Sequence, residues 1–355
     1  MASGRRPDTL EVLRARALGL GRAVRRAGKR NRGLTRIYHR LIGERERAYL
    51  ELGRLRSRIA GGSIRAGGVD PERIIWIFGS GRSGSTWLRS MMGEMDGVRV
   101  WEEPMIGRLF GEFYARAPKE NLRSADFVMG DPIRKGWIGS IRNFVLDGAR
   151  YSNPRLGAEE YLVIKEPNGS VGALLLMEAL PESRMILLVR DPRDVVASLL
   201  DAAREGGWLY ESREGRKGKR LRKIDRRPNS FVRERAKMYR RGVGNAGLAY
   251  DAHEGPKVLA RYEELRADTL GEMKRIYSVL GIPVEEEELR RAVEKHSWEN
   301  VPEEEKGRGK FYRRGTPGGW KEDLTPRQVE LVERTTASLL ERFYPEPWAH
   351  PGHRP

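Results

Sequence analysis

The chain has 355 residues, of which 39% are hydrophobic and 33% charged, and its formal net charge is +18. This length suits one large domain with an appendage, or two domains, and the hydrophobic content is sufficient for a packed core. The lack of cysteine excludes disulfides and thiolate metal sites, and five histidines without a ligand-like pair argue against a catalytic metal. Because the sequence has no run of 18 apolar residues and no signal-peptide core, we expect a soluble, cytoplasmic protein.

The positive charge is concentrated at the N-terminus. Residues 1–66 hold 18 Lys and Arg residues but only 5 Asp and Glu residues, so the remaining chain is nearly balanced, which argues against nucleic acid as the main partner. We interpret residues 1–68 as a basic helical arm with a linker, residues 69–346 as one domain and residues 347–355 as a short tail. Apolar residues at helical spacing in the arm favour packing on its own domain or a homo-oligomer, and its basic face leaves peripheral membrane contact open.

Residues 73–92 predict a strand, a loop and a helix. The apolar stretch 74–78 has β character, the loop GSGRSGST follows it over 79–86, and a helix is expected from Trp87. Small residues before a helix N-terminus expose backbone N–H groups beside the positive end of the helix dipole. The stretch therefore predicts an anion cradle.

The loop differs at one position from the P-loop of enzymes that bind nucleotide triphosphates. Gly79 and Gly84 have the spacing of that motif, but Ser85 stands where its lysine would be, and Arg82 is the cation of the loop. Without the lysine the loop is poorly equipped to hold β- and γ-phosphates with Mg²⁺. A P-loop kinase or other nucleotide-binding protein is therefore the alternative and not the first interpretation.

Further apolar stretches predict the rest of a central parallel β-sheet flanked by helices. Each predicted strand ends in charged or loop-forming residues, and parallel sheets bind ligands at their carboxyl ends, so we expect these residues to converge. Residues 105–160 are expected to cover one side of the sheet, and the basic insertion 204–230 is interpreted as solvated surface or a substrate lid. The other predicted strands are 98–101, 161–164, 184–189 and 257–262, and the predicted helices are 171–180, 195–203, 269–280, 285–295 and 325–342.

The chain resembles the PAPS-dependent sulfotransferases, which transfer a sulfuryl group from 3′-phosphoadenosine-5′-phosphosulfate (PAPS) and release PAP. Three blocks match in the family's order between about residues 73 and 345, and the first 60 residues lie outside the resemblance. The first block, RSGSTW over 82–87, is similar to the family's 5′-phosphosulfate loop. The resemblance implies that Ser83, Gly84, Ser85 and Thr86 hold the 5′-phosphate, that Arg82 neutralises charge on the bridging oxygen, and that Trp87 lies near the adenine.

The second block, VRDPRDVVAS over 189–198, is similar to the family's 3′-phosphate segment. The resemblance assigns this phosphate to Arg190 and Ser198, and a guanidinium with a hydroxyl suits a phosphate monoester. No metal is expected, because a sulfuryl group in transfer carries less charge than a phosphoryl group, so amides with one or two cations can stabilise it.

The third block resembles a further phosphate-binding segment and contains Arg313, Arg314 and Gly315. It departs from the family pattern at Arg314, where the family has lysine, and at a glycine that replaces the family's aspartate. Tyr262 and Trp298 occupy positions where the family places adenine-contacting residues. Packing in the core is the alternative for both aromatic side chains.

Two strand ends, VWEE and KEP, resemble segments of family members that act on protein tyrosines. The resemblance implies Glu103 as general base and Lys165 as transition-state stabiliser. Glu102 and Glu166 are the reserve bases, and a salt bridge to a neighbouring arginine is the alternative for Glu103. We therefore expect a P-loop-like sulfotransferase fold that transfers sulfuryl from PAPS to an unidentified acceptor hydroxyl. Nucleic-acid binding through the basic arm is the alternative function from another class.

Overall fold

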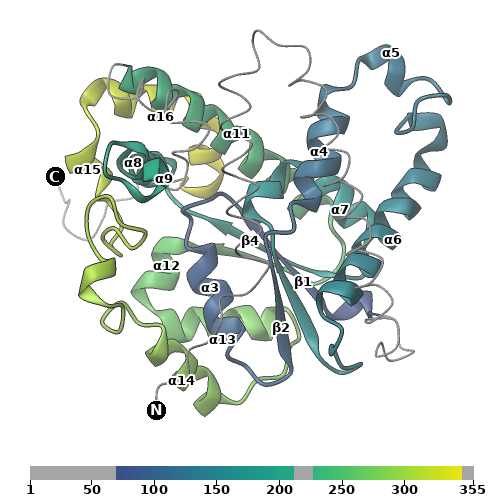
Figure 1. Ribbon diagram of the computed structural model, residues 1–355, viewed down its shortest axis with the longest axis horizontal. Helices are drawn as coiled ribbons and strands as arrows, with labels where there is room; N and C mark the ends of the chain where they lie inside the picture. The colour runs from purple at the N-terminus through teal and green to yellow at the C-terminus, as the bar shows by residue number, and fades with distance from the viewer. Residues whose placement is uncertain (1–68, 212–226, 346–355) are drawn as a thin grey trace, which may run out of the picture. The chain divides into compact units, whose positions relative to one another are not determined.

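The computed structural model describes residues 69–211 and 227–345, which form an α/β fold around a five-stranded sheet (Figure 1). The strands lie in the order β2–β3–β1–β4–β5, and every neighbouring pair is parallel, as the sequence predicted. They are β1 (Ile74–Gly79), β2 (Val98–Glu102), β3 (Tyr161–Lys165), β4 (Arg184–Val189) and β5 (Lys257–Arg261).

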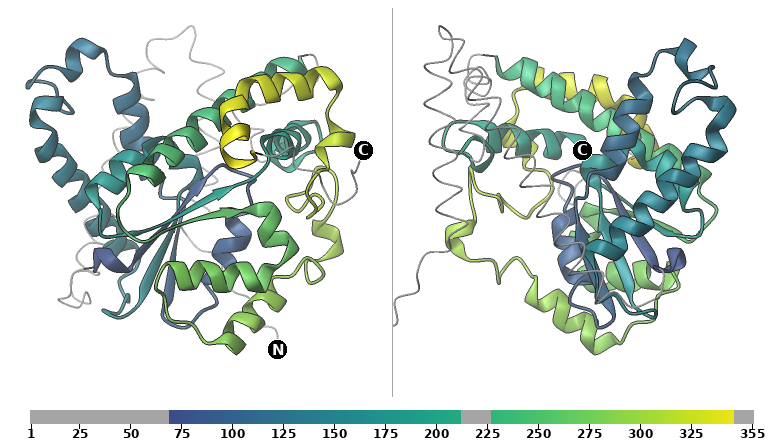
Figure 2. Two further views of the ribbon diagram at one scale, coloured as in Figure 1. Left: turned by 180° about the vertical axis from the view of Figure 1, so that it is seen from behind. Right: turned by 45° about the vertical axis from the view of Figure 1, so that its right-hand side comes forward.

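Helices cover both faces of the sheet, as the two turned views in Figure 2 also show. One face packs against α3 (Ser85–Met92), α12 (Tyr262–Ala267), α13 (Thr269–Val279) and α14 (Glu286–Lys295). The opposite face packs against α4 (Ile106–Arg116), α6 (Arg134–Ser152), α7 (Ala173–Ala179), α11 (Pro228–Ala252) and α16 (Pro326–Phe343). The remaining elements are η1 (Pro71–Arg73), α5 (Lys119–Leu122), η2 (Asp131–Ile133), η3 (Pro167–Gly172), α8 (Pro192–Ala203), α9 (Trp208–Glu211), η4 (Glu303–Glu305) and α15 (Trp320–Asp323).

The central strand β1 is buried over its whole length and separates two hydrophobic cores. Ile74, Trp76 and Phe78 belong to the core shared with α6, α7 and α11, whereas Ile75 and Ile77 belong to the core shared with α3, α13 and α14. This alternation follows from the two-residue period of a strand. A continuous apolar run is therefore required at β1, because both of its faces are covered.

The strand order places a crevice at the carboxyl end of β1. The connection from β1 leads to β2 on one side, and the connection from its neighbour β3 leads to β4 on the other side, so a topological switch point lies between β1 and β3. The loop between β1 and α3 lies at this point, so the predicted anion cradle occupies the position where such sheets bind ligands.

Two of the differences from the predicted elements concern β5 and α11. Strand β5 ends at Arg261 and not at residue 262, because Tyr262 already begins α12. The long helix α11 was not predicted, although it spans Pro228–Ala252 and packs on the sheet. Within the insertion at 204–230, residues 212–226 lie outside the described residues, as do the predicted arm 1–68 and tail 347–355. No helix among the described residues is long and apolar enough to cross a membrane.

Candidate active site

The loop between β1 and α3 turns sharply because Gly79, Arg82 and Gly84 have positive φ angles of 153°, 73° and 89°. A Cβ at Gly79 would lie 2.1 Å from the carbonyl oxygen of Leu188 on β4, so only glycine fits there. The Gly79 N–H donates to Ser170 Oγ at 2.9 Å, which anchors the loop to η3. Helix α3 follows Gly84 without a side-chain cap, so its first N–H groups remain available to a ligand.

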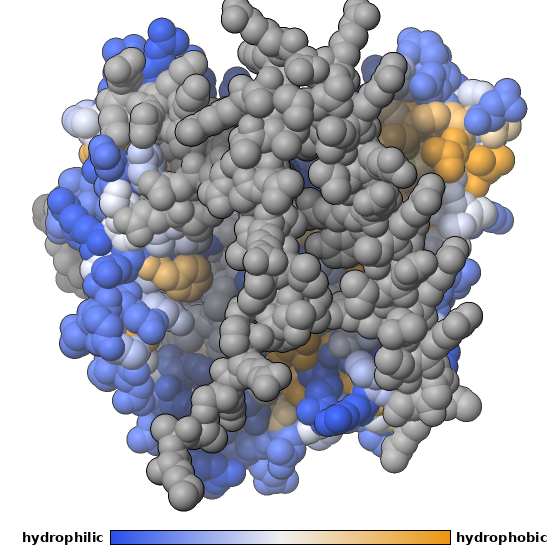
Figure 3. All heavy atoms as spheres, in the orientation of Figure 1, coloured by the Kyte–Doolittle hydropathy of each residue, from blue (hydrophilic) through white to orange (hydrophobic). Residues whose placement is uncertain are grey.

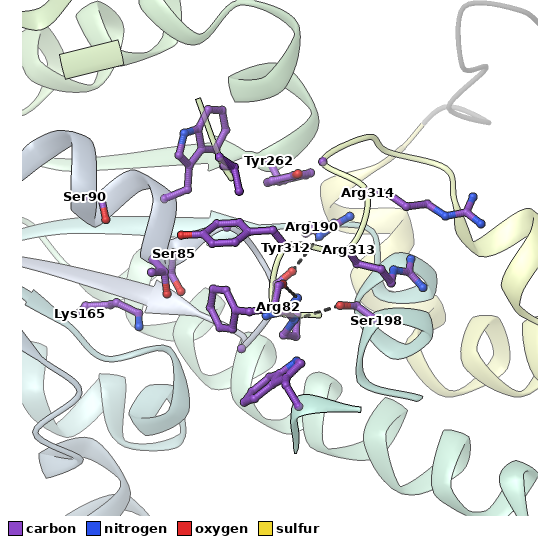
Figure 4. A pocket seen from close by; sticks show the side chains of 18 of the residues that line it. Arg82, Ser85, Ser90, Lys165, Arg190, Ser198, Tyr262, Tyr312, Arg313 and Arg314 are labelled. Atoms are coloured by element: carbon purple, nitrogen blue, oxygen red, sulfur yellow. Dashed lines mark hydrogen bonds between the residues drawn. The ribbon is translucent and has the colours of Figure 1, made fainter. Parts of the chain in front are cut away.

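A cavity of about 660 Å³ opens beside this loop at the carboxyl end of the sheet (Figure 4). Ser83 and the reserve bases Glu102 and Glu166 do not line it. The other predicted site residues do, namely Arg82, Gly84, Ser85, Thr86, Trp87, Glu103, Lys165, Arg190, Ser198, Tyr262, Trp298, Arg313, Arg314 and Gly315. Ser83 is fully buried, and its hydroxyl donates to the carbonyl of Ser80 at 2.7 Å. The Ser83 side chain therefore stabilises the loop, and its expected contact with a phosphate stays a prediction.

Arg82 lies at the centre of the cavity and joins the first block to the second. Its Nε donates to Ser198 Oγ at 3.0 Å, as drawn in Figure 4, and its Nη2 donates to the carbonyl of Phe311. Burial and the neighbouring Arg190 and Arg313 lower the pKa of Arg82 to about 10. Arg82 is therefore buried beside two further cations, and a bound anion would relieve their repulsion.

Arg190 is held in place from two sides. Its Nη1 donates to the carbonyl of Arg82 at 3.0 Å, and its Cζ lies 4.1 Å above the centre of the Tyr262 ring. The Tyr239 hydroxyl donates to the Arg190 carbonyl at 2.7 Å, which fixes the backbone. The Nε of Arg190 is buried and has no acceptor among the described residues. A buried donor without a partner is costly, so this nitrogen fits a ligand oxygen.

The third block reaches the cavity because α8 holds it there. The buried carboxylate of Asp194 accepts hydrogen bonds from the N–H groups of Gly318 at 2.7 Å and Trp320 at 3.0 Å. Arg313, which is only 8% exposed, pairs with Asp323 at 2.8 Å, and burial lowers its pKa. Three arginines from distant parts of the chain thus converge on one cavity.

A second group of charges lies at the ends of β2 and β3. Lys165 is nearly buried, and its Nζ donates to Glu103 Oε1 at 2.7 Å and to Glu102 Oε1 at 2.5 Å. Asn168 Nδ2 donates to the other oxygen of Glu103, Oε2, at 2.7 Å. Glu102 Oε2 pairs with Arg89 at 2.8 Å. Of the two carboxylates only Glu103 lines the cavity, and its φ of 41° is a strained value of the kind that functional sites tolerate.

The reserve base Glu166 has a different position. It is fully buried, and its two carboxylate oxygens accept hydrogen bonds from the N–H groups of Met105 and Gly107, each at 3.0 Å. Burial raises its pKa to about 7. Glu166 does not line the cavity, and its two hydrogen bonds hold the chain at the start of α4.

Aromatic side chains form the remaining wall. Trp87 and Tyr262 meet edge to face with ring centres 6.3 Å apart, and Trp298 lines the same cavity. A Cβ at Gly84 would lie 2.6 Å from the Tyr262 ring, and one at Gly315 would lie 2.4 Å from Trp298. Both glycines are therefore needed to let the loops approach these rings. Flat aromatic surfaces beside anion-binding groups suit a nucleotide base.

Two functional positions were not identified from the sequence. Asn168 follows β3 by three residues, and its place at a strand end was the available signal. Asp194 acts through a backbone contact to a segment more than 120 residues later, which no local pattern predicts. With them, the site can hold a ligand with two anionic groups and can take a proton from a hydroxyl at the carboxylate of Glu103.

Comparisons with known proteins show to which family the chain is similar. A family model described as a sulfotransferase domain matches residues 72–344. Human sulfotransferase 2B1 is 25% identical over 188 residues, which are 47% of this chain and 47% of that protein. Cytosolic sulfotransferase 12 of Arabidopsis thaliana is 27% identical over 213 residues, which are 54% of this chain and 60% of that protein. The chain thus spans about half the length of the curated relatives it matches.

Solved structures with similarity to the chain include sulfotransferase STF9 from Mycobacterium avium, with a TM-score of 0.47, 17% identity and 78% of both chains covered. Another is mouse sulfotransferase SULT7A1 complexed with PAP, with a TM-score of 0.47 and 14% identity. That match covers 77% of this chain and 86% of the mouse chain.

Proposed function

The chain belongs to the sulfotransferase domain family, and on that premise we propose that it transfers a sulfuryl group from PAPS to an acceptor hydroxyl. One observation carries the choice of donor. Arg82, Arg190 and Arg313 line a single cavity, and burial together with the repulsion from the other two arginines lowers the pKa of Arg82 to about 10. PAPS carries negative charge at both its 3′ and 5′ positions, so it matches a cavity lined by these three arginines.

The donor would be held from two directions. The N-terminus of α3, with Gly84, Ser85 and Thr86, is suited to the 5′-phosphate because its N–H groups have no side-chain cap. Arg190 and Ser198, with Arg313, are suited to the 3′-phosphate. The aromatic wall would hold the adenine. The hydrogen bond between Arg82 and Ser198 links the two anion positions, so Arg82 could contact either phosphate of the donor.

The proposed transfer is a displacement at sulfur. Glu103 accepts the hydroxyl proton of the acceptor, the acceptor oxygen forms a bond to sulfur, and the bond from sulfur to the 5′-phosphate oxygen breaks. The electron pair of that bond stays on the departing PAP. Lys165 and Arg82 stabilise the negative charge that develops on the transferred group and the leaving oxygen. The ion pair of Lys165 with Glu103 supports this assignment, because it places a base and a cation together in the cavity.

Ligand-induced thermal stabilisation tests the donor. At a ligand concentration of about 100 Kd, PAP should raise the melting temperature by about 5 °C, because a ligand that binds only the native state stabilises it. At the same concentration as PAP, adenosine 5′-phosphate, which lacks the 3′-phosphate, should give a smaller shift. ATP with Mg²⁺ should give the smallest, because the loop has Ser85 where a P-loop has lysine. A larger shift with ATP and Mg²⁺ than with PAP would refute the assignment.

A further inference from the structure

Helix α4 carries an apolar path that leads out of the cavity. Met105 precedes the helix, and Leu109 and Phe113 follow at intervals of four residues, so the three side chains lie on one face. Leu109 N–H donates to the Met105 carbonyl at 2.9 Å, which confirms the helical register between them. At 1.5 Å per residue, the path extends about 12 Å along the helix.

A groove connects this path to the cavity. It has a volume of about 360 Å³ and is lined by Met105, Arg108, Leu109, Glu112 and Arg116. Met105 and Arg108 also line the large cavity beside Glu103, so the two spaces share a wall.

The apolar residues of the path lie on the face of α4 that points away from η3. The helix packs through its opposite face, where a Cβ at Gly107 would lie 2.2 Å from the Gly169 carbonyl and one at Gly111 would lie 2.5 Å from Gly172. Leu109 and Phe113 remain 56% and 52% exposed. Exposed apolar side chains in a row, beside a reaction centre, indicate a surface that contacts a ligand.

The path ends on a larger apolar area. Phe113 stacks on Phe127, with ring centres 5.8 Å apart, and Val128 beside Phe127 in the chain is 65% exposed. Figure 3 shows hydrophobic colour at the upper right, over the lobe that α4, α5 and α6 form in Figure 1. A long apolar chain leaving the cavity would therefore stay in contact with apolar side chains beyond the groove.

One cation lies where the path meets the cavity. Arg108 makes no ion pair with any described residue, whereas Glu112, on the next turn, is already neutralised by Arg116 at 2.8 Å and Arg241 at 3.1 Å. Arg108 therefore offers an unbalanced positive charge to a ligand, close to the point where Glu103 would receive a proton.

From these observations we propose that the acceptor is a hydroxylated amphiphile with an acidic headgroup. Its hydroxyl faces Glu103, its acidic group pairs with Arg108, and its apolar chain lies along Met105, Leu109 and Phe113. This inference rests on the proposed function, because the hydroxyl is the group that receives the sulfuryl from PAPS.

A series of candidate acceptors distinguishes the effect of the apolar chain from the effect of the acidic headgroup. The full-length protein is assayed with PAPS and with 1-acyl-glycerol 3-phosphates carrying hexanoyl, decanoyl or tetradecanoyl chains, each below its micelle concentration. The matching 1-acyl-glycerols, which lack the phosphate, are the comparison. We expect kcat/KM to rise about twofold for each added methylene, half the effect of full methylene burial, until the chain passes Phe113. The phosphate-bearing acceptors should exceed the neutral ones about tenfold.

Two pairs of variants assign the effects to residues. Leu109→Gln should flatten the dependence on chain length, whereas Leu248→Gln, at a leucine with 53% exposure on α11, should not. Arg108→Gln should remove the advantage of the phosphate-bearing acceptors without changing the neutral ones, and Arg240→Gln, outside the groove and cavity, should have no effect. All four variants should keep the stabilisation by PAP.

Three outcomes would overturn the inference. The first is a wild-type kcat/KM that does not depend on chain length. The second is an equal loss in Arg108→Gln for acidic and neutral acceptors. The third is a sedimentation change in Leu109→Gln alone, which would show that the path is occupied by a second copy of the chain. A wild-type protein that PAP does not stabilise would instead refute the proposed function itself.

Discussion

At the scale of single residues, Lys165 binds two neighbouring carboxylates that differ in their other contacts. Glu102 and Glu103 both accept a hydrogen bond from Lys165 Nζ, but the second oxygen of Glu102 pairs with Arg89, and only Glu103 lines the cavity. Glu102 can therefore hold Lys165 in place when the contact of Lys165 with Glu103 is lost. This arrangement makes the two residues a matched pair for substitution.

Glu103→Gln should lower kcat by at least about 100-fold, because a positioned general base contributes roughly that factor or more. The variant should fold, since Lys165 keeps Glu102 as its partner. Glu102→Gln should lower kcat only a few-fold. Turnover with saturating PAPS, together with PAP binding by calorimetry, checks both. Equal losses in the two variants would remove Glu103 from the role of base.

Asn168 should act as a positioning residue for Glu103, because it donates to Glu103 Oε2 at 2.7 Å. Asn168→Ala should reduce kcat about tenfold and leave KM for PAPS unchanged. Asn168→Asp should also move the acidic limb of the pH–rate profile to higher pH, since two carboxylates would then adjoin. Asn300→Ala is the control, because Asn300 lines the same cavity but donates to the Glu294 carbonyl. A pH profile that is unchanged in Asn168→Asp would contradict this assignment.

At the scale of elements, the third block depends on a glycine with a defined conformation. Gly315 has a φ of 66°, and a Cβ there would meet the Trp298 ring at 2.4 Å. Gly281 has nearly the same φ, 62°, but open space around it. Backbone strain is therefore common to both positions, whereas contact with the cavity wall exists only at Gly315.

Gly315→Ala should weaken PAP binding about tenfold or more, because the methyl group must displace Trp298 or the segment that carries Arg313. Gly281→Ala should lower stability by about 1 kcal/mol through the positive φ alone and leave PAP affinity unchanged. Calorimetric titration with PAP and chemical denaturation of both variants separate the two effects. Loss of PAP affinity in Gly281→Ala would mean that global destabilisation is the cause.

The sequence predicted the strands and the residues at their ends, because a buried parallel strand is a continuous apolar run and its end changes abruptly to polar residues. It did not predict α11. The helix has a buried stripe of Val232, Ala236, Tyr239, Val243 and Ala246 at helical spacing, but the arginines and glycines between them obscure this stripe in the sequence. Hydrogen bonds between distant segments, such as that from the Gly318 N–H to Asp194, could not be predicted either, because they depend on how distant loops fold back.

At the scale of the whole molecule, two buried carboxyls connect stability to pH. Burial raises the pKa values of Glu166 and Glu263 to about 7. Glu263 accepts hydrogen bonds from the Asp191 N–H at 2.9 Å and the Tyr344 hydroxyl at 3.0 Å, so it joins the start of α8 to the end of α16. In the unfolded chain these groups would titrate near 4.5. Between the two values the native state holds protons that the unfolded state has released.

The free energy of unfolding should therefore fall as the pH rises from about 5 to about 7, and level off above that. Each group contributes at most about 3 kcal/mol to this fall. Below pH 4.5 the trend reverses, because hydrogen bonds lower the pKa values of Glu94 and Glu160 and their protonation destabilises the native state.

Glu263→Gln measures the contribution of Glu263 to the fall in the free energy of unfolding. An amide oxygen can still accept from the Asp191 N–H, and the Tyr344 hydroxyl can turn to accept from the amide nitrogen, so the fold should persist. The variant should match the wild type at pH 5 and be more stable at pH 8, because it has no charge to bury. Denaturant titrations at pH 5, 6, 7 and 8 measure the difference. If the wild-type and variant curves run parallel across this range, Glu263 is already ionised in the native state and the link between its burial and stability is refuted.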